Sequence, residues 1–289
     1  MSDDSESLRT GGVVVASDLD RTLIYSARAF WLDTPDDEAP AIVVSEIYQG
    51  SPLSFMTRAA EAGLRALMAE STFVPVTTRT TAQYRRVRLP GPMPDYAVTA
   101  NGGVILHRGL PDAAWRHDIA RRSESVCAPL AELVALTGSD WLSPGILRVH
   151  TAEELFVYAI VDRDVLSAEQ LEHLTAECTA RGWVVSLQGR KLYCVPAPIT
   201  KEAAVAEIAR RVGATTVLAA GDSLLDRGML AHATLAFRPH HGELDDAGYD
   251  APHLTVTRAR GLLAGEELVG LLRAAAAASA RAAAAPVFP

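Results

Sequence analysis

Residues 13–23 of the chain read VVVASDLDRTL, and this stretch indicates the class of fold. Three valines and an alanine in a row are typical of a short strand that is buried on both faces. Two carboxylates, Asp18 and Asp20, follow directly where this strand is expected to end. Ligands of α/β proteins bind beyond the carboxyl ends of parallel strands, so the stretch predicts both a strand and a site.

Three further apolar runs have the same form. They are FVPV at 73–76 before TTRT, YAVTA at 96–100 before NGG, and VLAA at 217–220 before GDS. Apolar residues at helical spacing predict amphipathic helices at 57–70 and 200–212. Alternating buried strands and helices predict an α/β protein with a doubly wound, mostly parallel Rossmann-like sheet.

Two segments interrupt this alternation. Residues 26–56 contain AIVVSEIY, the turn residues QGSP and then LSFM, which predicts an extended hairpin or flap. Residues 110–195 are expected to form a smaller α+β cap inserted into the larger domain. Its predicted helices are at 123–136 and 167–181, and its predicted strands are at 146–150, 155–161, 183–187 and 191–195.

The remaining segments complete the expected domain organisation. The catalytic core is predicted at 13–109 and 196–272. The acidic residues 1–12 are predicted to be a disordered N-terminus. Residues 273–289 are predicted to be an Ala-rich tail that follows the last helix.

The composition limits the classes of partner. The chain has 289 residues, 49% of them hydrophobic, and a formal net charge of -8, so a soluble globular protein without nucleic-acid partners is expected. Arg85, Arg86 and Arg88 form the densest basic cluster, which is typical of a solvated helix face. Three dispersed cysteines argue against a zinc site and favour the cytoplasm. No apolar run is long enough to span a bilayer, and the oligomeric state stays open.

The candidate chemistry lies in the carboxylates that follow the predicted strands. Asp18 and Asp20 are two residues apart, and Asp222 and Asp226 follow another strand. Four converging carboxylates repel one another unless a cation lies between them, and an all-oxygen donor set favours Mg²⁺. Lys201, at a helix start, adds a positive charge. Further donors at the same edge are Thr77, Thr78 and the amides near Asn101-Gly102-Gly103.

These residues resemble the motifs of the haloacid dehalogenase superfamily. SDLDRTL at 17–23 resembles its D-x-D-x-T signature. The other three motifs are matched in order by VTTR at 76–79, ITK at 199–201 and GDSLLDRGML at 221–230. The insertion between the second and third motifs, and the Asn101-Gly102 pair, resemble the subclass with an α/β cap. That subclass includes the Cof-type, sucrose-phosphate and mannosylphosphoglycerate phosphatases.

The resemblance implies a Mg²⁺-dependent phosphatase. Asp18 would attack phosphorus, and Asp20 would protonate the leaving oxygen and then activate water. The phosphate-binding residues would be Thr77, Thr78, Lys201 and Asn101. The metal would be held by Asp18, the backbone carbonyl of Asp20, Asp222 and, in support, Asp226. A sugar or polyol phosphate is the expected substrate; a nucleotide or phosphoglycolate-like substrate, or a non-catalytic phospho-ligand-binding module, are the alternatives.

The chain also departs from the family pattern. Arg21 stands where glycine is usual, Thr78 replaces a frequent glycine, and Leu225 stands where asparagine is common. Arg21 could reach an anionic group of the substrate. Three cap cations could bind a second anionic group, although such a residue is more often simply solvated on a strand: Arg148, Arg190 and Lys191.

Overall fold

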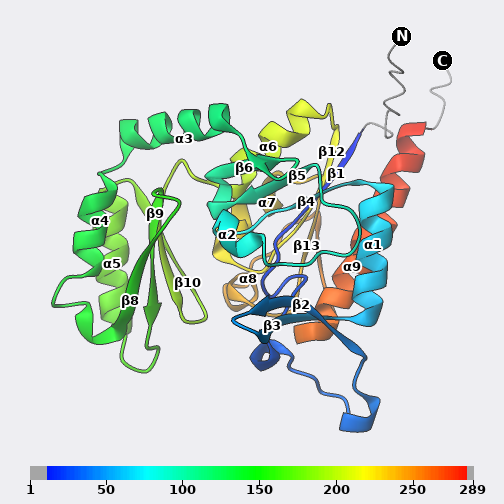
Figure 1. Cartoon of the computed structure of the whole chain (residues 1–289), viewed down its shortest axis with the longest axis horizontal. Coiled ribbons are helices and arrows are strands. Elements are labelled where there is room, and N and C mark those ends of the chain that lie inside the picture. Colours follow the sequence, from blue (N-terminus) through cyan, green and yellow to red (C-terminus); the bar gives the residue numbers. More distant parts are fainter. Residues whose placement is uncertain (1–11, 285–289) are drawn as a thin grey trace.

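A computed structural model describes residues 12–284 of the chain (Figure 1). Its centre is a five-stranded parallel sheet. In spatial order the strands are β14 (Leu254–Val256), β13 (Leu235–Arg238), β12 (Thr216–Ala220), β1 (Val13–Ser17) and β4 (Thr72–Pro75). β4 lies on one side of β1, and β12, β13 and β14 follow one another on the other side, which confirms the doubly wound α/β fold predicted from the sequence.

Helices cover both faces of this sheet because successive residues of β1 point to opposite sides. Val15 belongs to a cluster with Leu64 and Leu268, which lie on α1 (Arg58–Glu70) and α9 (Gly261–Ala284). Val14 belongs to another cluster with Val205 of α6 (Lys201–Arg211). Helix α7 (Arg227–His232) packs beside α6. The predicted helices at 57–70 and 200–212 are therefore confirmed.

A second, smaller sheet continues the core toward the cap. It is antiparallel and comprises β5 (Tyr96–Thr99), β6 (Val104–His107) and β7 (Leu110–Pro111), in that order. A parallel bridge between Val76 and Val98 aligns β5 with the end of β4. The short α2 (Thr81–Tyr84) lies between these strands in the sequence. The polar residues after β4 and β5 thus reach the same edge as those after β1.

The inserted cap is an antiparallel sheet covered by two helices. Its strands, in spatial order, are β10 (Trp183–Gln188), β11 (Lys191–Pro196), β9 (Phe156–Val161) and β8 (Ile146–Ala152). Its helices are α4 (Leu130–Thr137) and α5 (Ala168–Ala180). The predicted helix at 123–136 is wrong. Helix α3 (Ala113–Val126) ends before Pro129, because proline disfavours helical conformation in the residue that precedes it, and α4 begins afterwards.

The predicted flap is confirmed in its second half only. Strands β2 (Ile42–Tyr48) and β3 (Ser51–Thr57) form an antiparallel hairpin around Gln49 and Gly50. Both turn residues have positive φ, which matches the right-handed twist of the strands. Residues 26–41 instead hold two short 3-10 helices, η1 (Ala27–Ala29) and η2 (Asp36–Glu38).

The Ala-rich tail was predicted to begin at residue 273, but residues 273–284 continue helix α9. Alanine has the highest helix propensity, and Leu272 and Ala276 are buried in the cluster that contains Leu64 of α1. Figure 1 shows α9 running alongside α1 at this end of the core. The predicted disordered residues up to 11 and the last tail residues, 285–289, lie outside the described part. None of the described helices is long and apolar enough to cross a bilayer.

The packing of α9 gives a first prediction. Replacing Ala276, which is 7% exposed, by lysine places a long charged side chain in a filled interface. We expect Ala276→Lys to lower Tm by roughly 3–10 °C in a thermal melt followed by circular dichroism. Ala277→Lys is the matched control because Ala277 is exposed on the same helix, and its Tm should stay unchanged. Equal Tm values for both variants would show that α9 does not pack here.

Candidate active site

The carboxyl ends of two neighbouring strands build the centre of the site. Strands β1 and β12 pair in parallel, and the amide of Asp18 donates to Ala220 O at 2.9 Å. Asp222 lies two residues after the end of β12, and Asp226 ends the short helix η5 (Leu224–Asp226). Oxygens of Asp18, Asp222 and Asp226 lie within 4.8 Å of one another, and all three residues are buried. The structure therefore brings together three of the four predicted carboxylates.

Lys201 lies inside this cluster and is 1% exposed. Thr200 caps α6 by accepting from the amide of Ala203, and this cap fixes where the lysine side chain leaves the helix. Lys201 Nζ lies 2.7 Å from Asp18 Oδ1 and 2.5 Å from Asp226 Oδ1. Burial opposes the charge of Lys201, but the two carboxylates outweigh it and raise the lysine pKa. Lys201 is therefore a permanent cation against the predicted nucleophile.

Asp226 has both carboxylate oxygens occupied by hydrogen bonds. Oδ1 receives Lys201, and Oδ2 accepts from the amides of Asp222 and Ser223 and from Ser223 Oγ. Gly221 leaves room for this side chain, since a Cβ there would lie 2.4 Å from Asp226 Cγ. Asp226 thus orients the loop that carries Asp222, which fits a supporting role better than direct metal ligation.

When Asp18, Asp222 and Asp226 are all ionised, the single positive charge of Lys201 does not balance them. Burial and the neighbouring carboxylates raise the pKa of Asp18 to about 7, although Lys201 opposes the shift. Burial, Asp18 and Asp226 raise the pKa of Asp222 well above its usual range. Asp18 Oδ2 accepts only a 3.3 Å hydrogen bond from Thr22 Oγ1. These oxygen donors, with excess negative charge, fit a hard divalent cation such as Mg²⁺, held by Asp18 and Asp222.

This fit predicts how Mg²⁺ affects stability. Because the pKa of Asp18 is raised from 3.8 to about 7 on folding, the metal-free protein loses stability as pH rises through that interval. Mg²⁺ at about 100 times its Kd should raise Tm by roughly 5 °C near pH 8, and by less near pH 5, where protons compete. Differential scanning fluorimetry measures both shifts. Asp222→Asn should lose most of the shift; a Mg²⁺ shift that is the same at both pH values, or that survives this change, would refute the site.

Asp20 lies apart from the cluster, in an ion pair with Arg79. Arg79 Nε and Nη2 donate to the two oxygens of Asp20 at 2.6 and 2.8 Å. Partial burial disfavours the charge of Asp20, but Arg79 outweighs it and lowers the Asp20 pKa to about 2. The Asp20 side chain is 46% exposed, so its carboxylate faces the open side of the site. The side chain of Asp20 therefore does not join the carboxylate cluster, and its backbone carbonyl remains the proposed metal ligand.

Arg79 is a site residue whose role was not predicted from the sequence. Its Nη1 donates to Glu46 on β2 at 2.8 Å, and Glu46 also accepts from Arg86 and Ser54. Glu46 is 0% exposed, and Arg79 outweighs the burial to lower the Glu46 pKa. The flap hairpin is thus tied to Asp20 through one buried arginine. The sequence feature that could have identified Arg79 is its position directly after Thr77 and Thr78 of the second motif.

The predicted phosphate-binding residues surround the same edge. Thr77 and Thr78 are buried after β4, and Thr77 Oγ1 accepts from the amide of Arg79 at 3.2 Å. Asn101 Nδ2 donates to Ile199 O at 3.0 Å. Gly102 is required beside it, since a Cβ there would lie 2.1 Å from Thr200 O. We therefore assign Asn101 to holding the segment before Lys201 rather than to direct phosphate contact.

The four predicted specificity residues divide into two groups. Arg21 lies beside Asp20, and Lys191 on β11 is close enough for its charge to lower the Asp20 pKa further. Arg190 is in the turn after β10, and its Nε lies 3.5 Å from Val161 O of the cap itself. Arg148 is exposed on β8, two strands away from Lys191. The structure therefore brings Arg21 and Lys191 to the site.

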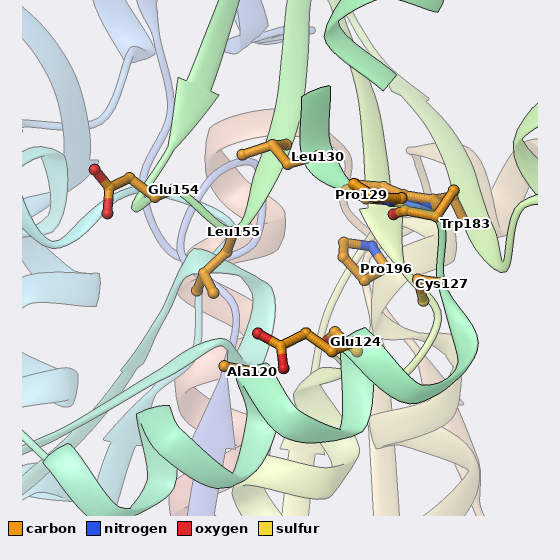
Figure 2. Close-up of a pocket in the computed structure, with 11 residues that line it drawn as sticks. Ala120, Glu124, Cys127, Pro129, Leu130, Glu154, Leu155, Trp183 and Pro196 are labelled. Atoms are coloured by element: carbon orange, nitrogen blue, oxygen red, sulfur yellow. The ribbon is translucent and has the colours of Figure 1, made fainter. Parts of the chain in front are cut away.

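A separate cavity of about 330 Å³ lies between α3 and the cap. Figure 2 shows Glu124 and Glu154 at its wall, with the ring of Trp183 on the other side. Trp183 Nε1 donates to Ala128 O, so only the apolar part of the ring is free for contact. Because its charged lining residues are carboxylates, this cavity does not suit a phosphate ester.

The chain is thus a two-domain α/β protein whose carboxylates and buried lysine meet where the cap covers the sheet edge. Solved structures that include a haloacid dehalogenase-like hydrolase share this fold. No protein-family model matches the chain, and no curated protein matches its sequence.

The chain does match the folds of solved structures, although at low sequence identity. The sucrose-phosphatase of Synechocystis, solved with sucrose and phosphate, is 14% identical, with a TM-score of 0.63 over 91% of this chain and 98% of that one. The C-terminal domain of C. albicans trehalose-6-phosphate phosphatase is 11% identical, with a TM-score of 0.55 over 92% and 93%. A haloacid dehalogenase-like hydrolase of B. subtilis is 16% identical, with a TM-score of 0.51 over 90% and 98%. At these identities the comparisons establish the fold.

Proposed function

We propose that the chain is a Mg²⁺-dependent phosphomonoester hydrolase that forms an aspartyl-phosphate on Asp18. The observation that carries this proposal is the buried contact between Asp18 and Lys201 beside Asp222, with Asp20 two residues further on. A sugar or polyol phosphate is the proposed substrate. Two of the compared structures support this choice, because they are a sucrose-phosphatase and a trehalose-6-phosphate phosphatase.

The residues divide the reaction into two displacements. Asp18 attacks phosphorus, the ester P–O bond breaks, and Asp20 gives its proton to the leaving alkoxide. Asp20 then takes a proton from water, which attacks the same phosphorus and releases phosphate and free Asp18. Lys201 and Thr77 hold the non-bridging oxygens throughout. Bound Mg²⁺ would supply positive charge against the phosphoryl group.

The Arg79 ion pair explains how Asp20 is switched between these tasks. With Arg79 bound, Asp20 is ionised, which suits a base but not an acid. A substrate phosphate dianion beside Arg79 would compete for its guanidinium and so raise the Asp20 pKa, and Asp20 would then take up a proton from solvent before giving it to the leaving group. The pair would re-form once the leaving group has departed. Asp20 thereby acts first as acid and then as base.

A screen of phosphorylated metabolites tests the proposed function. Released inorganic phosphate is measured with Mg²⁺ and with excess EDTA, and p-nitrophenyl phosphate serves as a general substrate. We expect turnover that requires Mg²⁺ and is highest for a phosphorylated sugar or polyol. Folded, metal-loaded protein that binds these esters without releasing phosphate would instead be a phospho-ligand-binding module.

A further inference from the structure

Among residues 12–284, two cations at the mouth of the site have charged groups that form no ion pair or hydrogen bond. The chain contains two lysines, Lys201 in the carboxylate cluster and Lys191 on the cap. Neither the Lys191 ammonium nor the Arg21 guanidinium makes a hydrogen bond or ion pair within residues 12–284. Both side chains are only half-buried. The proposed reaction already has Lys201 for the transferred phosphate, so these two charges are surplus to it.

Arg21 is held in place by groups that do not neutralise it. Its backbone has a φ of 60°, a conformation that non-glycine residues rarely adopt. His241 Nε2 lies 2.8 Å from Arg21 O, while His241 Nδ1 accepts from the amide of Gly261 at 3.2 Å. His241 therefore donates to Arg21 through Nε2. The guanidinium lies 5.7 Å from the ring of Trp31, which leaves its N–H donors open.

The same guanidinium reaches the cap. A Cβ built on Gly189, in the turn before β11, would lie 2.9 Å from Arg21 Nη2. The cap strand is also fastened to the core at this end. Glu243, on α8 (Glu243–Asp246), accepts from Ser186 Oγ of β10 at 3.2 Å and from the amide of Leu224 at 3.1 Å. The turn that carries Lys191 is thus fixed beside Arg21 and Asp20.

Lys191 points to the face of the cap sheet that covers the catalytic edge. Its register neighbours are Gln188 on β10 and Ile160 on β9, and Tyr193 lies on the same face two residues along β11. Its positive charge acts on Asp20, as the low Asp20 pKa reflects. Arg21 from the core and Lys191 from the cap therefore flank the space beyond Asp20, where the leaving group would lie.

We propose that the substrate is a phosphomonoester whose leaving group carries a second anionic group, a carboxylate or a second phosphate, bound between Arg21 and Lys191. This inference rests on the proposed hydrolysis at Asp18. Two unpaired cations in a chain of net charge -8 form a local positive site that neutral sugars cannot neutralise. A carboxylate or phosphate accepts from both donors at once and also draws the cap onto the core.

Matched pairs of substrates test this inference. Phosphogluconate against glucose phosphate, phosphorylated at the same carbon, isolates the carboxylate, and fructose bisphosphate against fructose monophosphate isolates the second phosphate. We expect kcat/KM to favour the acidic member of at least one pair by about tenfold or more. Arg21→Gln and Lys191→Gln should each reduce that preference about tenfold. Arg65→Gln removes an exposed charge on α1 and should preserve it.

A binding measurement separates failure of this inference from failure of the proposed function. Calorimetric titration of the Asp18→Asn protein with the same pairs reports recognition without turnover. The acidic member should bind about tenfold more tightly than its partner, and Arg21→Gln in this background should remove the difference. If phosphate release fails but this preference persists, the hydrolysis is wrong and the anion site stands. Equal binding of both members in both pairs, or a preference that neither variant changes, would overturn the proposed anion site.

Discussion

Replacing Asp18 by asparagine is expected to lower kcat by about four orders of magnitude or more, because the amide cannot form the aspartyl-phosphate, which is an acyl phosphate. The change is nearly isosteric, so the neighbouring side chains keep their positions. The substitution should therefore not lower the stability of the fold. The pKa of Asp18 is raised to about 7, so its charge is unfavourable in the metal-free protein near pH 8, and a neutral side chain removes that cost.

The measurement is phosphate release by Asp18→Asn in excess Mg²⁺, with Tm recorded on the same sample. Asp37→Asn, an exposed site on η2, is the matched control and should retain wild-type kcat. A Tm at or above that of the metal-free wild type, together with loss of turnover, would separate chemistry from folding. Turnover within tenfold of wild type would exclude Asp18 as the nucleophile.

Replacing Asp20 by asparagine is expected to lower steady-state kcat by about 10²- to 10⁴-fold, the usual contribution of a general acid–base residue. The two half-reactions should respond differently. p-Nitrophenolate is a good leaving group that needs little protonation, so attack by Asp18 continues. Hydrolysis of the aspartyl-phosphate still needs a base to activate water, so the phosphorylated enzyme accumulates.

Stopped-flow absorbance distinguishes this pattern from a general loss of structure. Asp20→Asn should release p-nitrophenolate in a burst stoichiometric with enzyme, followed by a slow steady state. Asp18→Asn should give no burst. A linear trace without a burst, in Asp20→Asn protein of normal Tm, would mean that Asp20 does not serve as the base of the second step.

The residues at the centre of the site could be predicted because they lie just beyond the carboxyl ends of parallel strands. Parallel strands β1 and β12 bring their carboxyl ends to one edge, so residues just after them, Asp18 and Asp222, had to meet. Lys201 was expected at the same edge because a helix start follows its cap, Thr200. These are local patterns within a regular sheet. Strands β1, β4 and β12 and the two amphipathic helices were predictable for the same reason, whereas β13 and β14 were not predicted and β5 belongs to a separate antiparallel sheet.

The contacts of Asp20 could not be predicted, because they depend on how separate elements pack. The ion pair with Arg79 spans 59 positions, and the next link, to Glu46, requires the flap to fold over β4. No periodicity marks Glu46 as a fully buried carboxylate on a two-stranded hairpin. Likewise the approach of Arg21 to Gly189 needs the cap and the core to be docked. The end of α9 was predicted wrongly, because an alanine-rich sequence is compatible with both a disordered tail and a helix.

Detecting the phosphoryl group on Asp18 is the most direct test of the proposed mechanism. Wild-type and Asp20→Asn proteins are mixed with p-nitrophenyl phosphate and Mg²⁺, quenched in acid and reduced with borohydride, which converts an acyl phosphate of aspartate to homoserine. Peptide mass spectrometry then locates the modified residue. We expect homoserine at position 18, at higher occupancy in Asp20→Asn than in wild type. An active enzyme that shows no modification at Asp18 under these conditions, or shows it at another carboxylate, would contradict it.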